Sequence, residues 1–395
     1  MKKDWSTHRH RTKLLSLLCA LSIFVSLIPA ALAAPPDGTQ KTALETALEN
    51  AVVQDAVTPA GVQLNLFDYW VNTRTSVDTH TEYANVKDSG INKNHYLKFN
   101  STGPDRDGAG TNINQWTGSR SPLSGIVKDR LSGGYPVLAS GKQCGEWLVD
   151  TTQEQSLAYL FDQSQQIDAA TEGGTPTGTI GKKTFWDVAG LLRVGKDGYY
   201  YYNANQNNVD EKKYESANYA CFNEKTNAFT LYNNWAVTRS GSSGIKGQFF
   251  PFTDPKTVFE LDGNNTNALT QASISSDSDA IHHYFGMTMT SRFIQRYDGK
   301  TDQTNGEAMT FEFSGDDDVW IFIDGVLVAD LGGIHDQATT TINFATGDIT
   351  INGEPAKTLK EKMSKYYGED SYWAKGKNTF ANDTYHTLKL FYLER

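Results

Sequence analysis

Three consecutive carboxylates mark the most chemically distinctive stretch of this 395-residue chain. Asp316, Asp317 and Asp318 directly precede an apolar run that begins Val-Trp-Ile-Phe-Ile. Adjacent like charges repel one another, so they need water or a cation close by. Further residues that suit a binding site follow in the same stretch: Asp330, Gly332, Gly333, His335 and Asp336.

The apolar run predicts a β-hairpin that gathers these residues. Asp324-Gly325 suits the two-residue loop of a type I′ turn. The first strand carries apolar residues on both faces, so we expect it to lie inside a sheet that is covered on both sides. The expected cross-strand pairs are Ile323–Val326, Ile321–Val328, Val319–Asp330, Asp317–Gly332 and Asp316–Gly333.

In this register the carboxylates and the two glycines meet at one end of the hairpin. Opposite Cα atoms lie about 5 Å apart there, and glycines permit close backbone approach. A hard cation with oxygen ligands neutralises such a cluster, and calcium fits this donor set best. We predict metal ligands at Asp316, Asp317 and Asp318, and a ligand-binding rim at Asp330, Gly332, Gly333, His335 and Asp336. The alternative is a solvated, Asp-rich turn without metal, since Asp is common in turns.

The sequence contains no recognisable catalytic constellation. Consecutive aspartates do not flank a scissile bond as a glycosidase pair does, and no G-x-S-x-G nucleophile motif occurs. His282 and His283 point to opposite faces if they lie in a strand. We therefore predict a protein that is not an enzyme. Exposed aromatic residues can stack on sugars, but packing is the favoured interpretation for the aromatic residues Tyr199 to Tyr202, Trp235 and Trp373.

Residues 1–33 have the pattern of an export signal. A basic start precedes the apolar run Leu14 to Leu27, and Ala31-Leu32-Ala33 fits a cleavage site. The apolar run is too short for a transmembrane helix. We predict a secreted protein, associated with the cell surface in its full-length form, in which residues 34–60 are a linker. The net charge of −10 argues against nucleic acid as a partner.

Two cysteines remain beyond the export signal, Cys144 and Cys221. In an oxidising compartment they are candidates for a disulfide. Two buried free thiols are the equally plausible alternative.

Short alternating runs predict the fold class. Examples are Val62 to Leu66, Met309 to Phe313 and Leu388 to Leu393, and Asp-Gly or Asn-Gly turns separate such runs. This pattern is typical of a mainly β chain that forms an antiparallel β-sandwich or barrel with few short helices. We expect an N-terminal β-rich region at 61–244 and a second domain at 245–395.

Several motifs in order give the second region a family resemblance. They are His283-Tyr-Phe-Gly-Met-Thr-Met, Phe311-Glu-Phe-Ser-Gly-Asp-Asp-Asp-Val-Trp-Ile-Phe-Ile-Asp-Gly, Leu331-Gly-Gly-Ile-His and Leu390-Phe-Tyr-Leu-Glu-Arg. Residues 245–395 thereby resemble the fibro-slime domain, which belongs to the lectin-like fold typified by anthrax protective antigen and yeast flocculins. Upstream segments are similar to those of large surface proteins of gut Firmicutes.

The resemblance implies a site and a function. In sugar-binding members of the wider fold, an Asp-Asp pair joined by a cis peptide holds calcium, and the calcium binds glycan hydroxyls. The aligned pair is Asp316–Asp317, with Asp318 where those members often have Gly. The implied function is calcium-dependent carbohydrate recognition or adhesion by a bacterial cell-surface protein, with an extracellular glycan or a host or cell-surface matrix as partner. The alternative is a non-catalytic structural surface or matrix domain with at most a structural ion.

The resemblance also bears on the end of the chain. Glu394-Arg395 falls inside a motif that continues in the family, which implies a fragment of a longer wall-associated protein.

Overall fold

The structure is a computed structural model that describes residues 42–71, 121–139, 156–162, 180–205, 216–233, 249–263, 265–272, 280–282, 285–333 and 335–394. The expected export signal and Cys144 lie outside the described residues.

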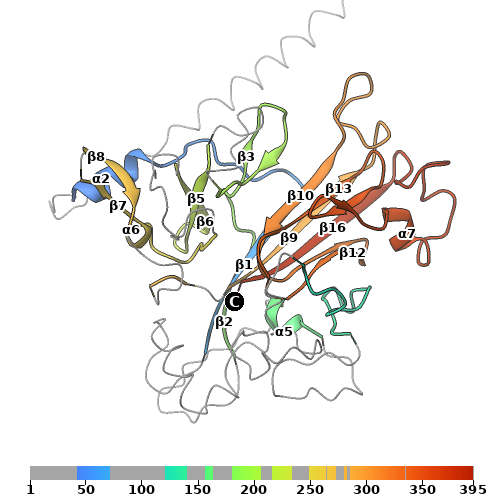
Figure 1. Ribbon diagram of the computed structural model, residues 1–395, viewed down its shortest axis with the longest axis horizontal. Coiled ribbons are helices and arrows are strands. Elements are labelled where there is room, and N and C mark those ends of the chain that lie inside the picture. Colours follow the sequence, from blue (N-terminus) through green and yellow to red (C-terminus); the bar gives the residue numbers. More distant parts are fainter. Residues whose placement is uncertain are drawn as a thin grey trace, which may run out of the picture.

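A six-stranded antiparallel sheet forms the centre of the molecule (Figure 1). Its strand order is β12-β11-β16-β9-β1-β2. Strands far apart in the sequence are neighbours in it, because β16 pairs with both β9 and β11. The strands are β1 (Val62–Val71), β2 (Ile180–Phe185), β9 (Phe285–Ile294), β11 (Val319–Ile323), β12 (Val326–Leu331) and β16 (Tyr385–Glu394).

A second, four-stranded sheet and three hairpins complete the β structure. The four-stranded sheet has the order β10-β13-β14-β15, with β10 (Thr310–Gly315), β13 (Ala338–Asn343), β14 (Ile349–Ile351) and β15 (Glu354–Pro355). The hairpins are β3 (Arg193–Val194) with β4 (Tyr200–Tyr201), β5 (Asn218–Asn223) with β6 (Ala228–Asn233), and β7 (Phe259–Asp262) with β8 (Asn265–Gln271).

The described helices are short. They are α2 (Ala43–Asn50), α5 (Ala158–Phe161), α6 (Pro255–Val258) and α7 (Leu359–Met363). Capping boxes at Thr42 and Thr358 start α2 and α7, because each threonine and a glutamate three residues later satisfy each other's backbone N–H groups. Helix α2 falls within the expected linker 34–60, yet Ala47 and Leu48 are buried in the main core.

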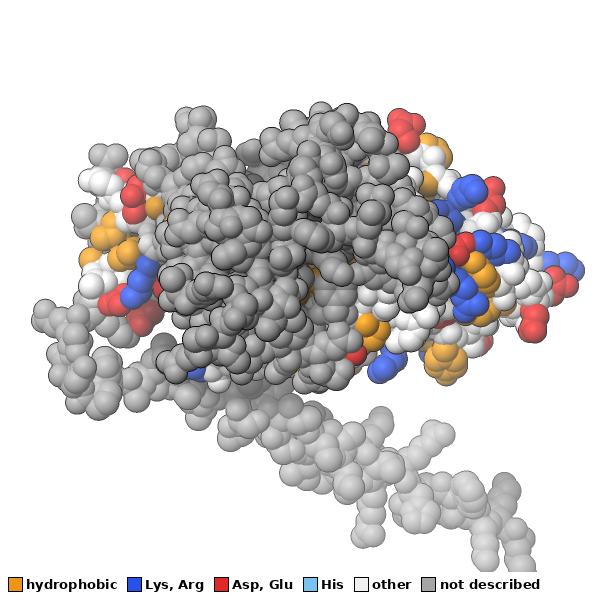
Figure 2. Space-filling model, turned by 90° about the horizontal axis from the view of Figure 1, so that it is seen from below, with side chains coloured by type: hydrophobic (Ala, Val, Ile, Leu, Met, Phe, Trp, Pro, Cys, Tyr) orange, Lys and Arg blue, Asp and Glu red, His pale blue; other side chains and the backbone are white. Residues whose placement is uncertain are grey.

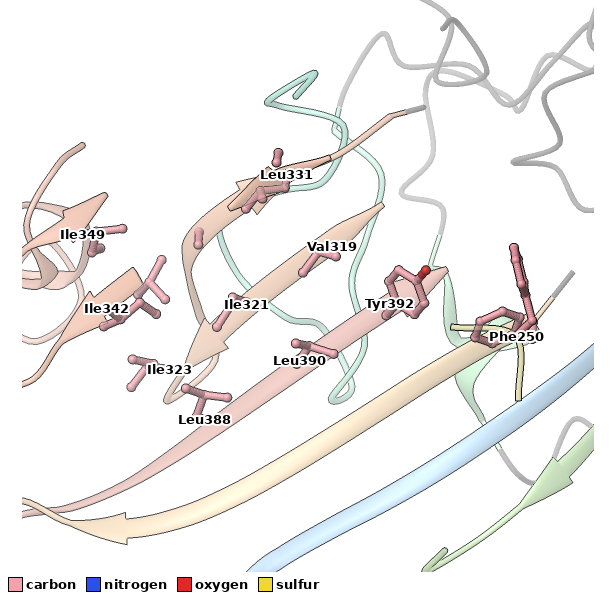
Figure 3. Packing of buried hydrophobic residues seen from close by; sticks show 14 of the residues in the cluster. Phe250, Val319, Ile321, Ile323, Leu331, Ile342, Ile349, Leu388, Leu390 and Tyr392 are labelled. Carbon is pink, nitrogen blue, oxygen red and sulfur yellow. The ribbon is translucent and has the colours of Figure 1, made fainter. Parts of the chain in front are cut away.

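Buried apolar residues cover both faces of the six-stranded sheet. One face carries Val319, Ile321, Leu388, Leu390 and Tyr392, which pack with residues of the second sheet such as Ile342 and Ile349 (Figure 3). The other face carries Trp320, Phe322, Phe391 and Leu393, which pack against residues 123–138 and α5. A third cluster joins β1 to the β5–β6 hairpin.

The edge of the sheet at β12 is covered by the segment 121–139. Leu123 N–H donates to the carbonyl of Gly332 at 2.6 Å, and Leu327 N–H donates to the carbonyl of Asp129 at 3.0 Å. Near the turn, Leu131 N–H donates to the carbonyl of Gly325 at 3.0 Å. An open strand edge would expose unpaired backbone groups, so this segment completes the sheet.

The β11–β12 hairpin confirms the expected turn and corrects the expected register. Asp324 and Gly325 have φ angles of 49° and 80°, as a type I′ turn requires, and Ile323 pairs with Val326. A bulge then places Ile321 opposite Ala329, so Val328 is the extra residue. Beyond it every pair shifts by one, and Val319 faces Leu331 instead of Asp330.

The fold is mainly β with antiparallel sheets, as the sequence predicts, and the described strands do not close into a barrel. All residues of β11 are buried, so its expected central position is confirmed. Strands from both sides of the expected boundary at 244/245 share the central sheet, because β1 pairs with β9.

Candidate functional site

The structure separates the predicted acidic cluster into two groups. Successive residues of an extended strand point to opposite faces, and Trp320 lies on the face covered by residues 123–138. Asp318 and Asp330 belong to this covered group, because Asp330 pairs with Trp320 and Asp318 precedes it by two residues. Asp316 and Asp317 act instead on the opposite side, where Tyr392 and Glu394 lie.

Asp318 and Asp330 hold the covered end of the hairpin together. Asp318 is fully buried, and its carboxylate accepts the backbone N–H of Gly333 at 2.6 Å. Asp330 accepts the backbone N–H of Gly125 at 2.6 Å. Burial raises the pKa of Asp330 to about 6, and the nearby Asp318 charge adds to this increase. The hydrogen bond from Gly125 and the positive charge of Lys362 lower the pKa and offset part of the increase. Both carboxylates are therefore engaged in the fold.

Gly332 and Gly333 make room for the covering segment. A Cβ atom on Gly332 would lie 2.8 Å from the carbonyl oxygen of Leu123 and 2.7 Å from the Ile126 side chain. One on Gly333 would lie 3.1 Å from Cβ of Leu123. The expected close backbone approach exists, but it is to another part of the chain. These two glycines therefore lie beneath residues 121–126 and do not line an open rim.

His335 stabilises the loop that follows β12 through hydrogen bonds to the backbone. Its two ring nitrogens lie 2.7 Å from the carbonyl of Asp336 and 3.3 Å from that of Leu331, and the residue is 3% exposed. Its backbone N–H donates to the carbonyl of Asp316 at 3.0 Å. With both nitrogens at backbone oxygens, His335 positions the Asp316 loop, while the neighbouring Asp336 is exposed.

The second group consists of Asp316 and Asp317 together with Glu394, and we call these three residues the acidic rim. Asp316 and Glu394 are partly exposed and Asp317 is 5% exposed. Burial, reinforced by the charges of Asp316 and Asp317, raises the pKa of Glu394 well above its usual range. Burial also raises the pKa of Asp316. Tyr392 donates its hydroxyl to Glu394.

Sequence reasoning missed Glu394 as a member of this group. The residue lies far along the chain from Asp316 and reaches the rim because β16 runs beside β11. It also shares a row and a face of the sheet with Asp68, since Glu394 pairs with Phe285 and Phe285 pairs with Asp68. Asp68 Oδ1 lies 2.7 Å from His282 Nε2. The Phe-Tyr-Leu-Glu alternation is the signal that places Glu394 on the same face as Tyr392.

The acidic rim fits calcium in its chemistry. It offers carboxylate oxygens, which hard cations prefer, and its negative charges act on one another in a partly desolvated place. Among the described residues, no three His, Cys, Asp or Glu side chains already form a metal-binding group. The backbone does not show the expected cis bond either, since no described peptide bond is cis. The donors are therefore present without a preformed coordination shell.

A second polar network lies at the opposite end of the hairpin. The carboxylate of Asp324 accepts from His386 Nδ1 at 2.7 Å, from the Tyr372 hydroxyl at 2.6 Å and from Thr387 N–H at 2.8 Å. His386 Nε2 contacts the Thr384 hydroxyl at 2.7 Å. This order of groups resembles a catalytic triad, but the His386 side chain is fully buried. The network stabilises the turn.

The structure describes some of the remaining candidates, which are the two cysteines and the aromatic residues. Cys221 has a free thiol in the structure, and burial raises its pKa to about 12; Cys144, its expected disulfide partner, lies outside the described residues. Trp373 is buried in the main core, which confirms the packing interpretation for it. Tyr201 is buried as well, whereas Tyr200 is exposed. Trp235 lies outside the described residues.

The surface and the helices bear on possible partners. None of the described helices is long and apolar enough to cross a membrane. At the right-hand end of the face in Figure 2, Lys and Arg side chains are interspersed with Asp and Glu side chains.

Parts of the chain are similar to psi proteins of Dictyostelium discoideum. Protein psiQ is 40% identical over 120 residues, which are 30% of this chain and 10% of psiQ. Protein psiD is 37% identical over 115 residues, 29% of this chain and 20% of psiD. Protein psiO is 31% identical over 162 residues, 35% of this chain and 20% of psiO. No family model matches the chain, and no solved structure matches it significantly.

The chain thus spans a small part of the length of these curated relatives. Their names state neither a ligand nor an activity, so the similarity adds no chemistry to the acidic rim. A proposal about function rests on the sequence patterns and on the geometry of the site.

Proposed function

We propose that this protein is a secreted or cell-surface binding module without catalytic activity, which recognises extracellular carbohydrate through calcium at the acidic rim. The observation that carries the proposal is that β16 runs beside β11 and Leu393 N–H donates to the carbonyl of Asp318 at 3.0 Å, which brings Glu394 close to Asp316 and Asp317. Carboxylates from two segments share one partly desolvated place, and the pKa of Glu394 rises because of its burial, with the charges of Asp316 and Asp317 adding to the effect. A cation relieves this repulsion.

Each part of the proposed site has a separate role. Asp316, Asp317 and Glu394 would hold the ion. Calcium at such a site supplies open coordination positions that oxygen ligands such as sugar hydroxyls can fill. His335 holds the loop that carries Asp316, and Asp318 fastens the start of β11 to Gly333. The predicted ligands Asp318, Asp330, Gly332 and Gly333 therefore support the rim from the covered side.

The sequence supports the location and the ligand class. Residues 1–33 fit an export signal, which supports a site outside the cell, where free calcium is abundant enough for a weak site. The resemblance of residues 245–395 to the fibro-slime domain supports carbohydrate as the ligand. The bacterial origin that this resemblance implies belongs to the same proposal.

Calorimetric titration of metal-stripped protein with calcium tests the metal part of the proposal. We expect saturable binding by the wild-type chain and loss of binding in Asp317→Asn and Glu394→Gln. Asp370→Asn is the matched control, because Asp370 is exposed and distant in sequence from the rim. Its binding should equal that of the wild type. No heat of binding for the wild type at millimolar calcium contradicts the proposal.

A glycan array with and without calcium tests the ligand class. We expect retention on at least one glycan that depends on calcium and disappears in Asp317→Asn. If calcium binds but the array stays blank, the carbohydrate part fails and the metal part stands.

The second candidate is a structural surface or matrix domain with at most a structural ion. The engagement of Asp318, Asp330 and His335 in hydrogen bonds within the fold favours it. It predicts a thermal shift with calcium and no retained glycan.

A further inference from the structure

Three unsatisfied amide atoms lie at one end of the β5–β6 hairpin. Among the described residues, Asn218 Oδ1, Asn233 Oδ1 and Asn203 Nδ2 are buried atoms that have no hydrogen-bond partner. Asn218 is 1% exposed. An unpaired polar atom away from water costs free energy, so each such atom calls for an explanation.

Asn218 and Asn233 face each other at close range. They are cross-strand partners in the β5–β6 pair. Their backbone N–H groups point away from each other, because Asn218 donates to the carbonyl of Asn203 at 2.7 Å and Asn233 donates to that of Ala51 at 2.8 Å. They therefore form a non-hydrogen-bonded pair, whose Cα atoms lie about 4.5 Å apart. Their side chains share the face of Ala220 and Leu231, which belong to the third core cluster.

Asn203 lies beside Asn218 through its backbone. The Asn203 carbonyl accepts the backbone N–H of Asn218. A local turn orients the Asn203 side chain. Asn205 N–H donates to Asn203 Oδ1 at 3.0 Å, so the oxygen is identified and the free atom is the NH₂ nitrogen. The three amides together present two acceptors and one donor.

The surrounding charges disfavour an ion at this place. Arg193 is 7% exposed and forms a bidentate ion pair with Asp55 at 2.8 and 2.9 Å. It also donates to the Ser216 hydroxyl at 3.1 Å. Asn218 Nδ2 contacts the same hydroxyl at 3.4 Å. The guanidinium disfavours a cation, although Asp55 offsets part of its charge, and the two unpaired amide oxygens disfavour an anion.

We propose that Asn218, Asn233 and Asn203 bind one ordered water molecule. A water molecule donates twice and accepts from the remaining donor, which matches the three unfilled atoms. Buried waters typically make about three such hydrogen bonds to otherwise unsatisfied groups. The oxygen and nitrogen of the Asn218 amide can also be exchanged. Its oxygen then accepts from the Ser216 hydroxyl, and its nitrogen faces the water. In that case the water accepts from Asn218 and Asn203 and donates to Asn233. The site therefore fits water in both amide orientations.

The water has a structural consequence. It joins β5, β6 and the segment that follows β4 through side chains, next to the Arg193–Asp55 pair. Since Asp55 belongs to the segment after α2, the water contributes to fixing the N-terminal part of the described chain to the β5–β6 hairpin.

Crystallography of the full chain tests the site directly. We expect one density peak within hydrogen-bond distance of the Asn218 and Asn233 side chains. The proposal is overturned by a direct hydrogen bond between the two amides with no peak. It is also overturned by a peak with metal-like contacts of about 2.4 Å that shows anomalous signal after a soak in rubidium chloride.

A thermodynamic cycle gives a test in solution. Asn218→Leu and Asn233→Leu each remove one partner of the water and leave the other amide unsatisfied, so each lowers the melting temperature. The double variant removes both amides with the water, and its melting temperature falls by less than the sum of the two single changes. Additive changes overturn the proposal. Asn65→Leu combined with Asn233→Leu is the control, because the buried Asn65 amide already has two partners, and this pair should be additive.

Discussion

Leu123 donates its backbone N–H to the carbonyl oxygen of Gly332 at 2.6 Å, so the segment 121–126 lies directly on the paired glycines. Gly332 and Gly333 of the expected binding rim therefore belong to an internal contact of the fold. The hydrogen bond from Gly125 N–H to Asp330 extends the same contact. The acidic rim of Asp316, Asp317 and Glu394 takes no part in this contact.

Gly332→Ala tests this contact. The added Cβ would lie 2.7 Å from the Ile126 side chain and 2.8 Å from the Leu123 oxygen, so the covering segment must move. Overpacking of this kind costs about 1–3 kcal/mol, which we expect as a lower free energy of unfolding in urea. Gly263→Ala is the control, because its Cβ would meet no atom within 4 Å. Equal stability of the two variants would show that the segment does not rest on Gly332.

Asp330→Asn should make stability less dependent on pH. Burial raises the pKa of Asp330 to about 6 from an ordinary value of 3.8. The folded protein therefore holds this proton more tightly than the unfolded chain does, and the stabilisation is complete below about pH 4 and lost as the pH rises through 6. The displaced pKa corresponds to about 3 kcal/mol.

The measurement is urea unfolding at pH 4 and pH 7 in the presence of a chelator. Between these values the stability of Asp330→Asn should rise relative to wild type by roughly that 3 kcal/mol. The exposed Asp370→Asn serves for comparison and should follow the wild type at both pH values. Parallel pH curves for Asp330→Asn and wild type would rule out a buried, proton-binding Asp330.

The hairpin shows how far the sequence alone reaches. The Asp324-Gly325 turn and the central place of β11 follow from local chemistry, namely positive φ angles and apolar residues on both faces. The bulge at Val328 leaves no such signal. Val326 to Ala329 are all apolar, so a slip by one residue exposes nothing to water and the burial pattern does not fix the register.

The members of the acidic rim show the complementary limit. Asp316 and Asp317 are visible in the sequence as adjacent carboxylates, but Glu394 joins them through the pairing of β16 with β11 and β9. The contact of Leu123 with Gly332 also joins distant parts of the chain, and the alternation of apolar and polar residues does not predict it. Local chemistry predicts turns and strands, whereas the partners of a site depend on which distant strands lie side by side.

Glu394→Gln should have opposite effects with and without calcium. Burial and the charges of Asp316 and Asp317 raise the pKa of Glu394, so the stabilisation from its protonated form is lost as the pH rises through that value. In a chelator at pH 8, the glutamine therefore raises the melting temperature. With calcium, the wild type gains stability by mass action and the variant gains little.

Differential scanning fluorimetry at several calcium concentrations measures both effects. A variant that gains as much from calcium as the wild type would remove Glu394 from the metal site. If the variant is instead less stable than the wild type in chelator, the repulsion inferred for the acidic rim is absent.

Asp324→Asn should distinguish the contribution of the turn conformation from that of the hydrogen bonds to the Asp324 carboxylate. Asparagine adopts the positive φ of a type I′ turn as well as aspartate does, so the backbone of the turn is retained. The lost charge weakens the hydrogen bonds from His386, Tyr372 and Thr387, and hydrogen bonds to charged groups contribute about 1.5–3 kcal/mol each. We expect a loss of at least about 2 kcal/mol in the free energy of unfolding at pH 7.

The same carboxylate gives a pH signature. Burial raises the pKa of Asp324, but the hydrogen bonds from His386, Tyr372 and Thr387 outweigh it and hold the pKa below its ordinary value. Its stabilisation is therefore present above about pH 4 and lost as the pH falls further, so Asp324→Asn and the wild type should converge in stability towards pH 2. Asp187→Asn is the matched control, an exposed aspartate at a φ of 53° that accepts one side-chain hydrogen bond, from Gln63. A loss that persists unchanged at pH 2 would mean that the aspartate acts through the shape of the turn and not through its charge.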